Sequence, residues 1–573
     1  MPKVISLIII AIISFTNTFS QDTLLTIITE ELNREFEVLK NEEFPPYYMD
    51  YKVEDAEYLS MSSTFGSLIR SKKYRNRAFV PNIRIGSYKF DNSHLLEDDM
   101  YNEYSNDNSR AIPLPLDNKA LAIKKELWKA TDWAYVSTVN AYRMVLDQKN
   151  DSKVDTLIAD FSKEKPNVYY EAITDIKIDD DEIKKWEKQL KELTAPFVND
   201  SLIISADAYL SASIKRNYFV STEGSSIVQN FANAQLYVVV LVKDNQGNIT
   251  PYNKSYNAKS IDKLPSRNQL LSDLNNVLNT LELLKQAQNA KPFTGPAILS
   301  ASAAGVFFHE IFGHRIEGHR LKSNSDGQTF KDKTNQEVLP KTFNVSFDPN
   351  LVNFDTINLN GHYKFDDEGI SGKKVSVVNN GILTDFLMSR SPINSIPNSN
   401  GHGRAQIGKK AVSRQSNMVI ETTKSFTDAE LRKKLIKECK KQKKEYGYYF
   451  DEVIGGFTIT NRYMPNVFNI SPTKVYKIYV DGRPDELVKG VGLIGTPLAM
   501  FSMIDAAGDT KAVFNGYCGA ESGSVPVSTI APSIFVKQIE TQLMPVEKIE
   551  IPLLPRPGIS DKNKLEIIKA NGL

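Results

Sequence analysis

A His-Glu pair followed by a second histidine constrains the fold of this chain more than any other feature. The motif reads His309-Glu310-Ile311-Phe312-Gly313-His314 and ends an apolar run. Two imidazoles and a carboxylate are the groups that a hydrolytic zinc site needs, because imidazoles hold the metal and a carboxylate accepts a proton from the water that the metal acidifies. If the motif holds a metal and is not a coincidence, the chain has to fold so that His309 and His314 converge, with Glu310 beside them as the candidate general base.

The spacing of the two histidines excludes the familiar metalloprotease helix. That helix has its histidines four residues apart, which places them one turn apart on the same face. Here they are five residues apart, so on an ideal helix their side chains diverge by roughly 140°. We therefore predict a helix distorted by a π-bulge or a kink, with Gly313 as the residue that tolerates the distortion.

A third metal ligand has to come from elsewhere in the chain, which has only two cysteines. Cys439 follows Leu431 and Leu435 at four-residue intervals, so we predict a buried thiol on an amphipathic helix. Cys518 lies between glycines in Asn515-Gly516-Tyr517-Cys518-Gly519, which we interpret as a loop where a thiolate can approach a metal. Alone, Cys518 would be a free loop cysteine; beside the histidine motif, ligation is favoured. A disulfide between the two cysteines would abolish ligation.

Five segments in this order resemble the TldD/PmbA family of metallopeptidases, from about residue 293 to about residue 545. They are His309-Glu310-x-x-Gly313-His314-x-x-Glu317-Gly318, Asp366-Asp367-Glu368-Gly369, Asn400-Gly401-His402-Gly403-Arg404, Lys489-Gly490-Val491-Gly492-Leu493-Ile494-Gly495 and Cys518-Gly519-x-Glu521-x-x-Ser524-Val525-Pro526-Val527. The resemblance implies that His309, His314 and Cys518 are zinc ligands and that Glu310 is the general base. It also implies a homodimer, or a heterodimer with a family member, and it matches the half of such pairs that keeps the His-Glu motif.

These features predict a zinc-dependent peptidase that hydrolyses peptides or unfolded segments. The strand-rich second half of the chain favours a substrate that binds as an added β-strand. One alternative is a non-catalytic peptide-binding or partner subunit of such a dimer, and another is a zinc-holding envelope protein without peptidase activity. The ligand set suits Zn2+, although iron or cobalt could occupy it.

Residues 1–20 have the organisation of a secretory signal peptide. Lys3 precedes an apolar run from Val4 to Ile13, and small residues end at Ser20. We expect an exported protein, periplasmic or secreted, with no stable membrane span after cleavage; an uncleaved signal anchor is the minority alternative. The whole chain has a net charge of +1, and loss of Lys3 removes it, so charge gives no argument for nucleic-acid binding.

The rest of the chain predicts an α+β protein. We place an N-terminal domain of antiparallel strands with long helices at residues 21–292, and a strand-rich, barrel-like metallopeptidase domain at 293–573. The metal-binding helix opens the second domain, after a short strand at 297–299, with its N-cap at Ser300 or Ser302. Helices are expected at 23–40, 117–149, 179–193, 266–290 and 427–445. Strands are expected at 202–215 and 234–242, and the apolar run Leu236–Val242 is interpreted as a buried central strand.

Several other polar or glycine-rich segments are further candidates for functional sites. Gly490–Gly495 formally matches a dinucleotide fingerprint, but Pro497 follows it, so we favour a loop near the active site. His319 is interpreted as a surface histidine because Arg320 adjoins it. Glu317 is the better candidate for a hydrogen bond to a ligand imidazole. His402 and the Asp366–Glu368 segment are by default turn residues, although each could lie near the metal or the substrate, and His94 and His362 are unassigned.

Overall fold

The computed structural model describes residues 22–94, 110–151, 158–243, 248–322, 326–461 and 467–544. The expected signal peptide at residues 1–20 lies outside these ranges. Among the described helices, none combines the length and the apolar character needed to cross a membrane.

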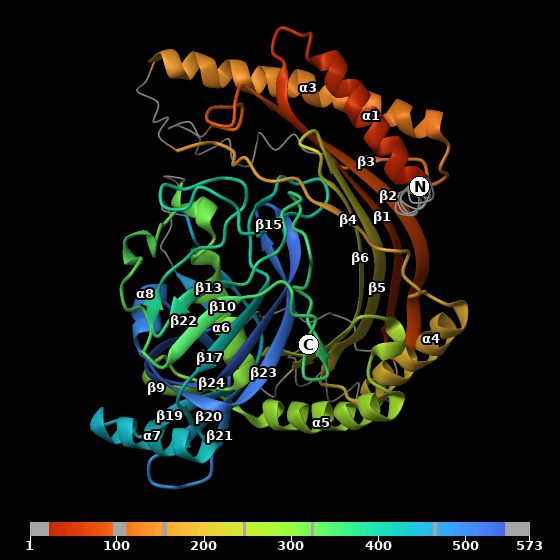
Figure 1. The fold of residues 1–573 in the computed structure, drawn as a ribbon. Helices are drawn as coiled ribbons and strands as arrows, with labels where there is room; N and C mark the ends of the chain where they lie inside the picture. The colour runs from red at the N-terminus through yellow and green to blue at the C-terminus, as the bar shows by residue number, and fades with distance from the viewer. Residues whose placement is uncertain are drawn as a thin grey trace, which may run out of the picture.

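A seven-stranded sheet forms the first half of the chain, with the order β3-β2-β1-β5-β6-β4 and β7 paired to β6. All of its pairs are antiparallel except β4 with β6. Its strands are β1 (Pro46–Thr64), β2 (Ser67–Ile85), β3 (Ile112–Pro113), β4 (Val168–Tyr170), β5 (Ile203–Ser221), β6 (Ser226–Lys243) and β7 (Ile249–Ala258). Figure 1 shows this sheet as a curved wall opposite the second half of the chain.

Four helices pack against one face of this sheet: α1 (Thr23–Leu39), α3 (Ala120–Asp151), α4 (Asp180–Thr194) and α5 (Arg267–Gln286). Helices α1 and α3 lie across one end of the strands, and α4 and α5 lie at the other end (Figure 1). The buried strand residues recur at every second position, such as Tyr51 and Val53 under α1 and α3, and Leu59 and Met61 under α4. Since alternate residues of a strand point to opposite faces, all four helices cover the same side of the sheet.

Strand β6 corrects one expectation. The apolar run Leu236–Val242 was expected to be buried throughout, but only every second residue is buried, beginning with Leu236 and Val238. The alternate residues, Tyr237 among them, are half-buried on the face that the helices do not cover. The apolar run thus correctly predicted a strand inside the sheet. It did not predict that one face of this strand is only half-buried.

The uncovered face of the sheet contacts the second half of the chain through Gln229 of β6. Its side-chain Nε2 donates to the carbonyl of Phe365 at 2.9 Å, and its Oε1 accepts from the backbone N–H groups of Lys364 and Phe365. Asn167 adds a hydrogen bond to the carbonyl of Gly369 at 2.9 Å. These bonds fix the turn that carries Asp366–Glu368 against the sheet.

The second half of the chain is a strand-rich, barrel-like assembly around one buried helix, α6 (Ala301–Ile311). Hydrogen-bonded pairs run from β24 to β9, β19, β20 and β22, and then return from β22 to β24. The strands of this sheet are β8 (Gln288–Asn289), β9 (Phe293–Leu299), β10 (Phe343–Phe347), β13 (Val375–Asn379), β14 (Ile382–Leu383), β17 (Asn417–Thr422), β18 (Ser425–Phe426), β19 (Tyr446–Thr458), β20 (Phe468–Tyr479), β21 (Glu486–Lys489), β22 (Val491–Gly495), β23 (Ile504–Ala520) and β24 (Gly523–Leu543). Helix α6 packs on β19, β23 and β24, and Figure 1 shows it enclosed by these strands.

The remaining elements of this half are short. Two-stranded ribbons join β11 (Asn353–Phe354) to β12 (Ile357–Asn358) and β15 (Gly403–Arg404) to β16 (Val412–Ser413). Two more helices are α7 (Asp428–Lys441) and α8 (Pro497–Ser502). The Gly490–Gly495 segment, expected to be a loop, turns at Gly490 and continues as β22, so it is part of the barrel-like sheet.

The α+β class and the strand-rich second half confirm the predicted fold. The boundary at residue 292 stays a prediction. Helix α7 buries Leu431, Leu435 and Cys439 against the sheet, as their four-residue spacing predicted. Both cysteines are free, so the disulfide alternative does not occur.

Candidate metal centre

Helix α6 begins at an N-cap and ends abruptly between the two histidines of the motif. The side chain of Ser300 accepts a hydrogen bond from the backbone N–H of Ala303 at 3.2 Å, which confirms the expected cap. The α-helix ends at Ile311, and Gly313–Arg315 form a single 3-10 turn. The expected distortion is therefore a change of helix type rather than a bulge within a continuing helix. It brings the rings of His309 and His314 to a centroid distance of 5.0 Å.

Gly313 leaves room at this turn for the amide of a neighbouring side chain, Gln415. A Cβ atom at this position would lie 2.1 Å from Oε1 of Gln415, far inside van der Waals contact. The backbone at Gly313 does not have a positive φ. The glycine thus serves close approach, and not the unusual backbone conformation that the sequence suggested.

Cys518 lies beside the two histidines, on β23 rather than in the expected loop. It pairs with Val525 of β24, near the end of the hairpin that joins the two strands. Its Sγ atom lies 3.3 Å from Nε2 of His314. Ligand atoms of His309, His314 and Cys518 all lie within 4.8 Å of one another, and all three residues are buried.

The donor set at this cluster fits a zinc ion. Two imidazoles and a thiol are ligands that zinc prefers, and three protein ligands leave a coordination position open. The Nδ1 atom of His309 is buried and has no hydrogen-bond partner among the described residues. A buried donor or acceptor without a partner is rare in a folded protein, and a bound ion is one explanation for it.

The electrostatics favour a thiolate at Cys518. Burial alone raises the pKa of this thiol, but His314 and then His309 outweigh burial and hold the pKa well below its usual range. Burial lowers the pKa of His314, whereas the Cys518 thiolate and Glu317 raise it, to a net value of about 10. Since a thiolate is the form that binds metals, the cluster presents sulfur in its ligand form.

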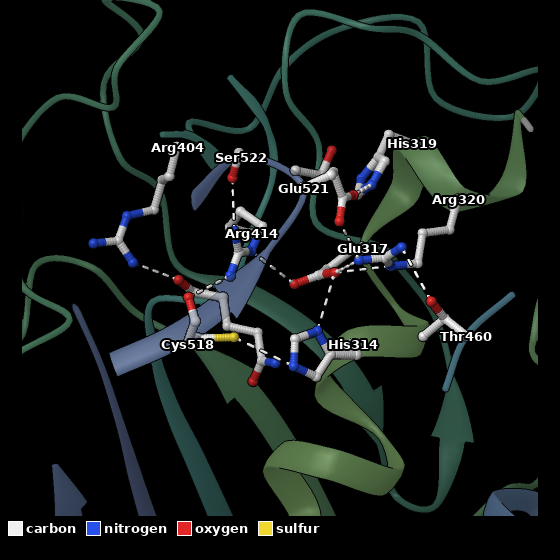
Figure 2. Close-up of polar contacts among 12 residues, drawn as sticks. His314, Glu317, His319, Arg320, Arg404, Arg414, Thr460, Cys518, Glu521 and Ser522 are labelled. Carbon is white, nitrogen blue, oxygen red and sulfur yellow. Dashed lines mark hydrogen bonds and ion pairs between the residues drawn. The ribbon is translucent and has the colours of Figure 1, made fainter. Parts of the chain in front are cut away.

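Glu317 orients the second histidine, as Figure 2 shows. Its Oε2 atom lies 3.4 Å from Nδ1 of His314, so Nε2 of the same ring faces Cys518. This is the contact that the sequence suggested for Glu317. The carboxylate is fully buried, and burial raises its pKa, but His314 and Arg320 lower the pKa to about 2.

Two arginines hold Glu317 and connect it to the Cys518 hairpin. Arg320 donates from Nε to Glu317 at 2.9 Å and from Nη2 to Glu521 at 3.1 Å. Arg414 lies 3.5 Å from the other oxygen of Glu317, and its Nη2 donates to the backbone carbonyl of Cys518 at 2.6 Å. The arginines thus bind carboxylates and a backbone carbonyl around the cluster (Figure 2).

His319 and Arg320 correct another expectation. Arg320 is buried, not exposed, and it forms ion pairs with Glu317, Glu521 and Asp326. His319 is half-buried, and its Nε2 contacts Glu521. His319 therefore belongs to the charged network around the centre, which sequence position alone did not reveal.

Glu310 lies next to His309 on α6 but is not one of the clustered ligands. Its residue is 6% exposed. Its Cγ and Cδ atoms lie so close to Gly456 of β19 that a Cβ there would be 2.8 and 3.3 Å from them. Its backbone carbonyl accepts a hydrogen bond from Arg315 at 2.7 Å. The structure thus places the carboxylate between α6 and β19; its role as a base stays a prediction.

The other candidate segments lie outside the cluster. Asp366 accepts backbone hydrogen bonds from Glu368, Ile370 and Gly403, which is the polar turn that the sequence favoured. His402 is fully buried, with its Nε2 3.1 Å from the hydroxyl of Ser416. Both help to shape the backbone near the centre and neither joins the ligand set.

Sequence reasoning missed a run of five buried polar residues, Ser413-Arg414-Gln415-Ser416-Asn417. Arg414 and Gln415 of this run contact the segments that carry the three candidate ligands. The signal was present as an uninterrupted polar run directly before the apolar residues of β17. The sequence of this run does not distinguish it from an exposed loop, because burial of polar residues depends on distant partners.

Comparison with known proteins agrees with this geometry. Residues 293–542 match the PmbA/TldA metallopeptidase C-terminal domain. A metalloprotease of Methanocaldococcus jannaschii is 28% identical over 392 residues, which cover 68% of this chain and 80% of that protein. A zinc metalloprotease TldD homolog of Saccharolobus solfataricus is 25% identical over 401 residues, covering 67% and 83%.

The crystal structure of TldE from Thermococcus kodakarensis has a similar fold. It superimposes with a TM-score of 0.60 and 13% identity, over 91% of this chain and 100% of that one. At this identity the likeness shows the fold alone. The matched domain makes the second half of the chain similar to the PmbA/TldA metallopeptidases. Residues 293–542 are therefore a domain of the TldD/PmbA family.

Proposed function

We propose that this protein is a zinc-dependent peptidase that hydrolyses peptides or unfolded segments. The observation that carries the proposal is the convergence of His309, His314 and Cys518, whose ligand atoms lie within 4.8 Å of one another. The relatives named metalloprotease or zinc metalloprotease support the same reaction class. Zinc bound by these residues would polarise a peptide carbonyl and lower the pKa of a bound water towards about 7.

The protein's own residues supply the proton transfers in this proposal. Glu310 takes a proton from the attacking water and returns it to the nitrogen of the leaving amine. Glu317 holds His314 with Nε2 directed at the centre, and Arg414 holds the backbone of Cys518. Arg320 and Arg414 balance the charge of Glu317. The buried carboxylate can therefore orient the imidazole of His314 and need not replace it as a metal ligand.

Strand β23 offers a place for an extended substrate. On one side it pairs with β24 along its length. On the other side its strand partner in the described part of the chain is β18, which covers only Ala507 and Gly508. The remaining edge leads to Cys518, so a peptide that pairs with it would reach the centre. N-methylation of single peptide bonds should weaken binding of such a substrate.

We also propose that the mature protein is exported and acts as a homodimer or as a heterodimer with a family member. Residues 1–20 motivate the first statement and the family resemblance motivates the second. Cell fractionation and light scattering on the mature protein test them separately from catalysis. A cytoplasmic or strictly monomeric protein would contradict the respective proposal.

The deciding experiment combines metal analysis with a peptide-hydrolysis assay. The mature protein, purified without chelators and with a reducing agent, should carry about one zinc per chain. It should cleave unfolded polypeptides in a screen, and Glu310→Gln should keep the zinc while losing cleavage. A protein that binds zinc and peptide but does not cleave the peptide would be the non-catalytic binding subunit instead. A protein without metal would refute the proposed centre.

A further inference from the structure

Gln415 places a buried amide against the turn that separates the two candidate histidine ligands. The residue is 1% exposed. Its Nε2 lies 3.5 Å from the backbone carbonyl of His309. Its Oε1, which is also buried, has no hydrogen-bond partner among the described residues. A buried oxygen without a partner is unfavourable and rare in folded proteins, which suggests a role for its polarity.

The same amide fills the space at Gly313. A Cβ at Gly313 would lie 2.1 Å from Oε1, 2.4 Å from Cδ and 2.6 Å from Nε2 of Gln415. All three amide atoms therefore pack directly on the residue before His314. One end of the amide reaches the carbonyl of His309, so the side chain spans the change from α-helix to 3-10 turn.

The chain neighbour of Gln415 reaches the third candidate ligand. Arg414 donates to the carbonyl of Cys518 at 2.6 Å and to the hydroxyl of Ser522 at 2.6 Å. The backbone carbonyl of Gln415 accepts from Arg404 at 2.5 Å, which anchors the dipeptide itself. Two consecutive residues thus contact the backbone on both sides of the cluster.

Building on the metal centre of the proposed function, we propose that Gln415 is a positioning residue for that centre. Its amide sets the turn that brings His309 and His314 together. Metal binding should therefore depend on the polar amide of Gln415, and a side chain of equal volume without an amide should not replace it.

Asn417, two residues further on, provides a matched control. It is also fully buried, its Oδ1 is also without a hydrogen-bond partner in the described structure, and it packs closely on Gly361. However, its Nδ2 donates to the carbonyls of Asp348 and Leu351, away from the cluster. A general loss of buried amide contacts would affect both residues alike.

The test compares Gln415→Met and Asn417→Leu, which preserve side-chain size and remove the amide. Zinc affinity is measured by chelator competition. The ligand field is measured from the absorption spectrum of the cobalt-substituted protein, and stability by thermal unfolding. Gln415→Met should weaken zinc binding by about 10–100-fold and change the cobalt spectrum. Asn417→Leu should lower the melting temperature but leave zinc affinity and spectrum unchanged.

A second variant, Gln415→Glu, keeps the length of the side chain but removes the Nε2 donor to the His309 carbonyl, so it should also bind zinc more weakly than the unmodified protein. The proposal is overturned if Gln415→Met binds zinc like the unmodified protein with the same cobalt spectrum. It is also overturned if Gln415→Glu binds zinc as tightly as the unmodified protein, with the same cobalt spectrum. These results differ from failure of the proposed function, in which the unmodified protein itself would bind no zinc.

Discussion

The Sγ atom of Cys518 lies 3.3 Å from Nε2 of His314, although 204 positions separate the two residues in the sequence. One residue follows a buried helix, and the other lies near the end of a long strand. The candidate centre therefore exists only when the barrel-like sheet has formed around α6. Metal binding should accordingly report on the tertiary structure of the second half of the chain.

Replacing Cys518 should remove the metal. In Cys518→Ser the thiolate is lost, and a serine hydroxyl is a poor zinc ligand, so zinc content should fall from about one per chain to near zero. Mass spectrometry of the purified, reduced proteins measures this directly. Retention of full zinc in the variant would exclude Cys518 from the ligand set.

Cys439→Ser is the matched control for that experiment. Cys439 is fully buried in the apolar cluster under α7, and burial raises the pKa of its thiol to about 11. A hydroxyl there would be buried without a partner, which should lower the free energy of unfolding by about 1–3 kcal/mol. Zinc content should be unchanged, which separates loss of stability from loss of a ligand.

Glu310→Gln should separate catalysis from metal binding. The amide has nearly the same shape as the carboxylate but cannot accept the proton of the attacking water. Peptide hydrolysis should fall by about 100–10,000-fold. Zinc content and melting temperature should stay close to those of the unmodified protein. Hydrolysis at the original rate would mean that another group is the base.

The position of Glu310 can be tested through its neighbour on β19. The methyl group in Gly456→Ala would lie 2.8 Å from Cγ of Glu310 and also 2.8 Å from the backbone carbonyl of Asn469 on β20, so both the carboxylate and the local pairing of β19 with β20 should shift. Misplacement of a catalytic group by about 1 Å can reduce the rate up to about 100-fold. Gly455→Ala, where a Cβ has nothing within 4 Å, should leave the rate unchanged. Equal rates in both variants would argue against a role for the Glu310 carboxylate in this position.

Glu317→Gln should weaken both the fold and the centre. The substitution removes the buried counter-charge beside Arg414, whereas Arg320 keeps Glu521 and Asp326; the loss should cost roughly 3–5 kcal/mol in the free energy of unfolding. It also replaces the carboxylate that orients His314 with an uncharged and weaker amide acceptor, so zinc affinity should fall by about 10–100-fold. Chemical denaturation and chelator competition measure the two effects. Unchanged zinc affinity would show that His314 is oriented by other means.

His402 should make stability depend on pH. Burial lowers the pKa of His402 to about 3 in the folded protein, against an unfolded value of 6.5. The unfolded chain therefore binds the proton first. The stabilisation is complete above pH 6.5 and is lost as the pH falls towards 3, by about 1.4 kcal/mol per unit. Between pH 6.5 and 5 the unmodified protein should lose about 2 kcal/mol more than His402→Gln. Parallel denaturant curves in this range would contradict the prediction.

The local parts of the centre could be predicted from the sequence. The apolar run with its serine cap predicted α6, and the five-residue spacing predicted that an ideal helix could not continue to His314. The four-residue spacing in α7 predicted the burial of Cys439. Each of these follows from contacts within one helix, where sequence distance and spatial distance agree.

The parts that sequence did not reveal depend on partners far along the chain. Arg320 was interpreted as exposed because arginine usually is, yet Glu521 and Glu317 make its burial possible. Cys518 was placed in a loop because glycines flank it, yet the long partner β24 keeps that segment in a strand. Nothing in the local pattern of Arg414 and Gln415 indicated the turn that they contact.

Strand β24 pairs with β9, β17, β22 and β23, so four neighbours depend on one continuous segment. It contributes none of the three candidate ligands. Its central amides, from Ser528 to Val536, should nevertheless be among the slowest in the protein to exchange with deuterium, since exposing them requires several pairs to open together. Any partly opened state in which these amides exchange should also have lost the pairing that holds Cys518 beside His314.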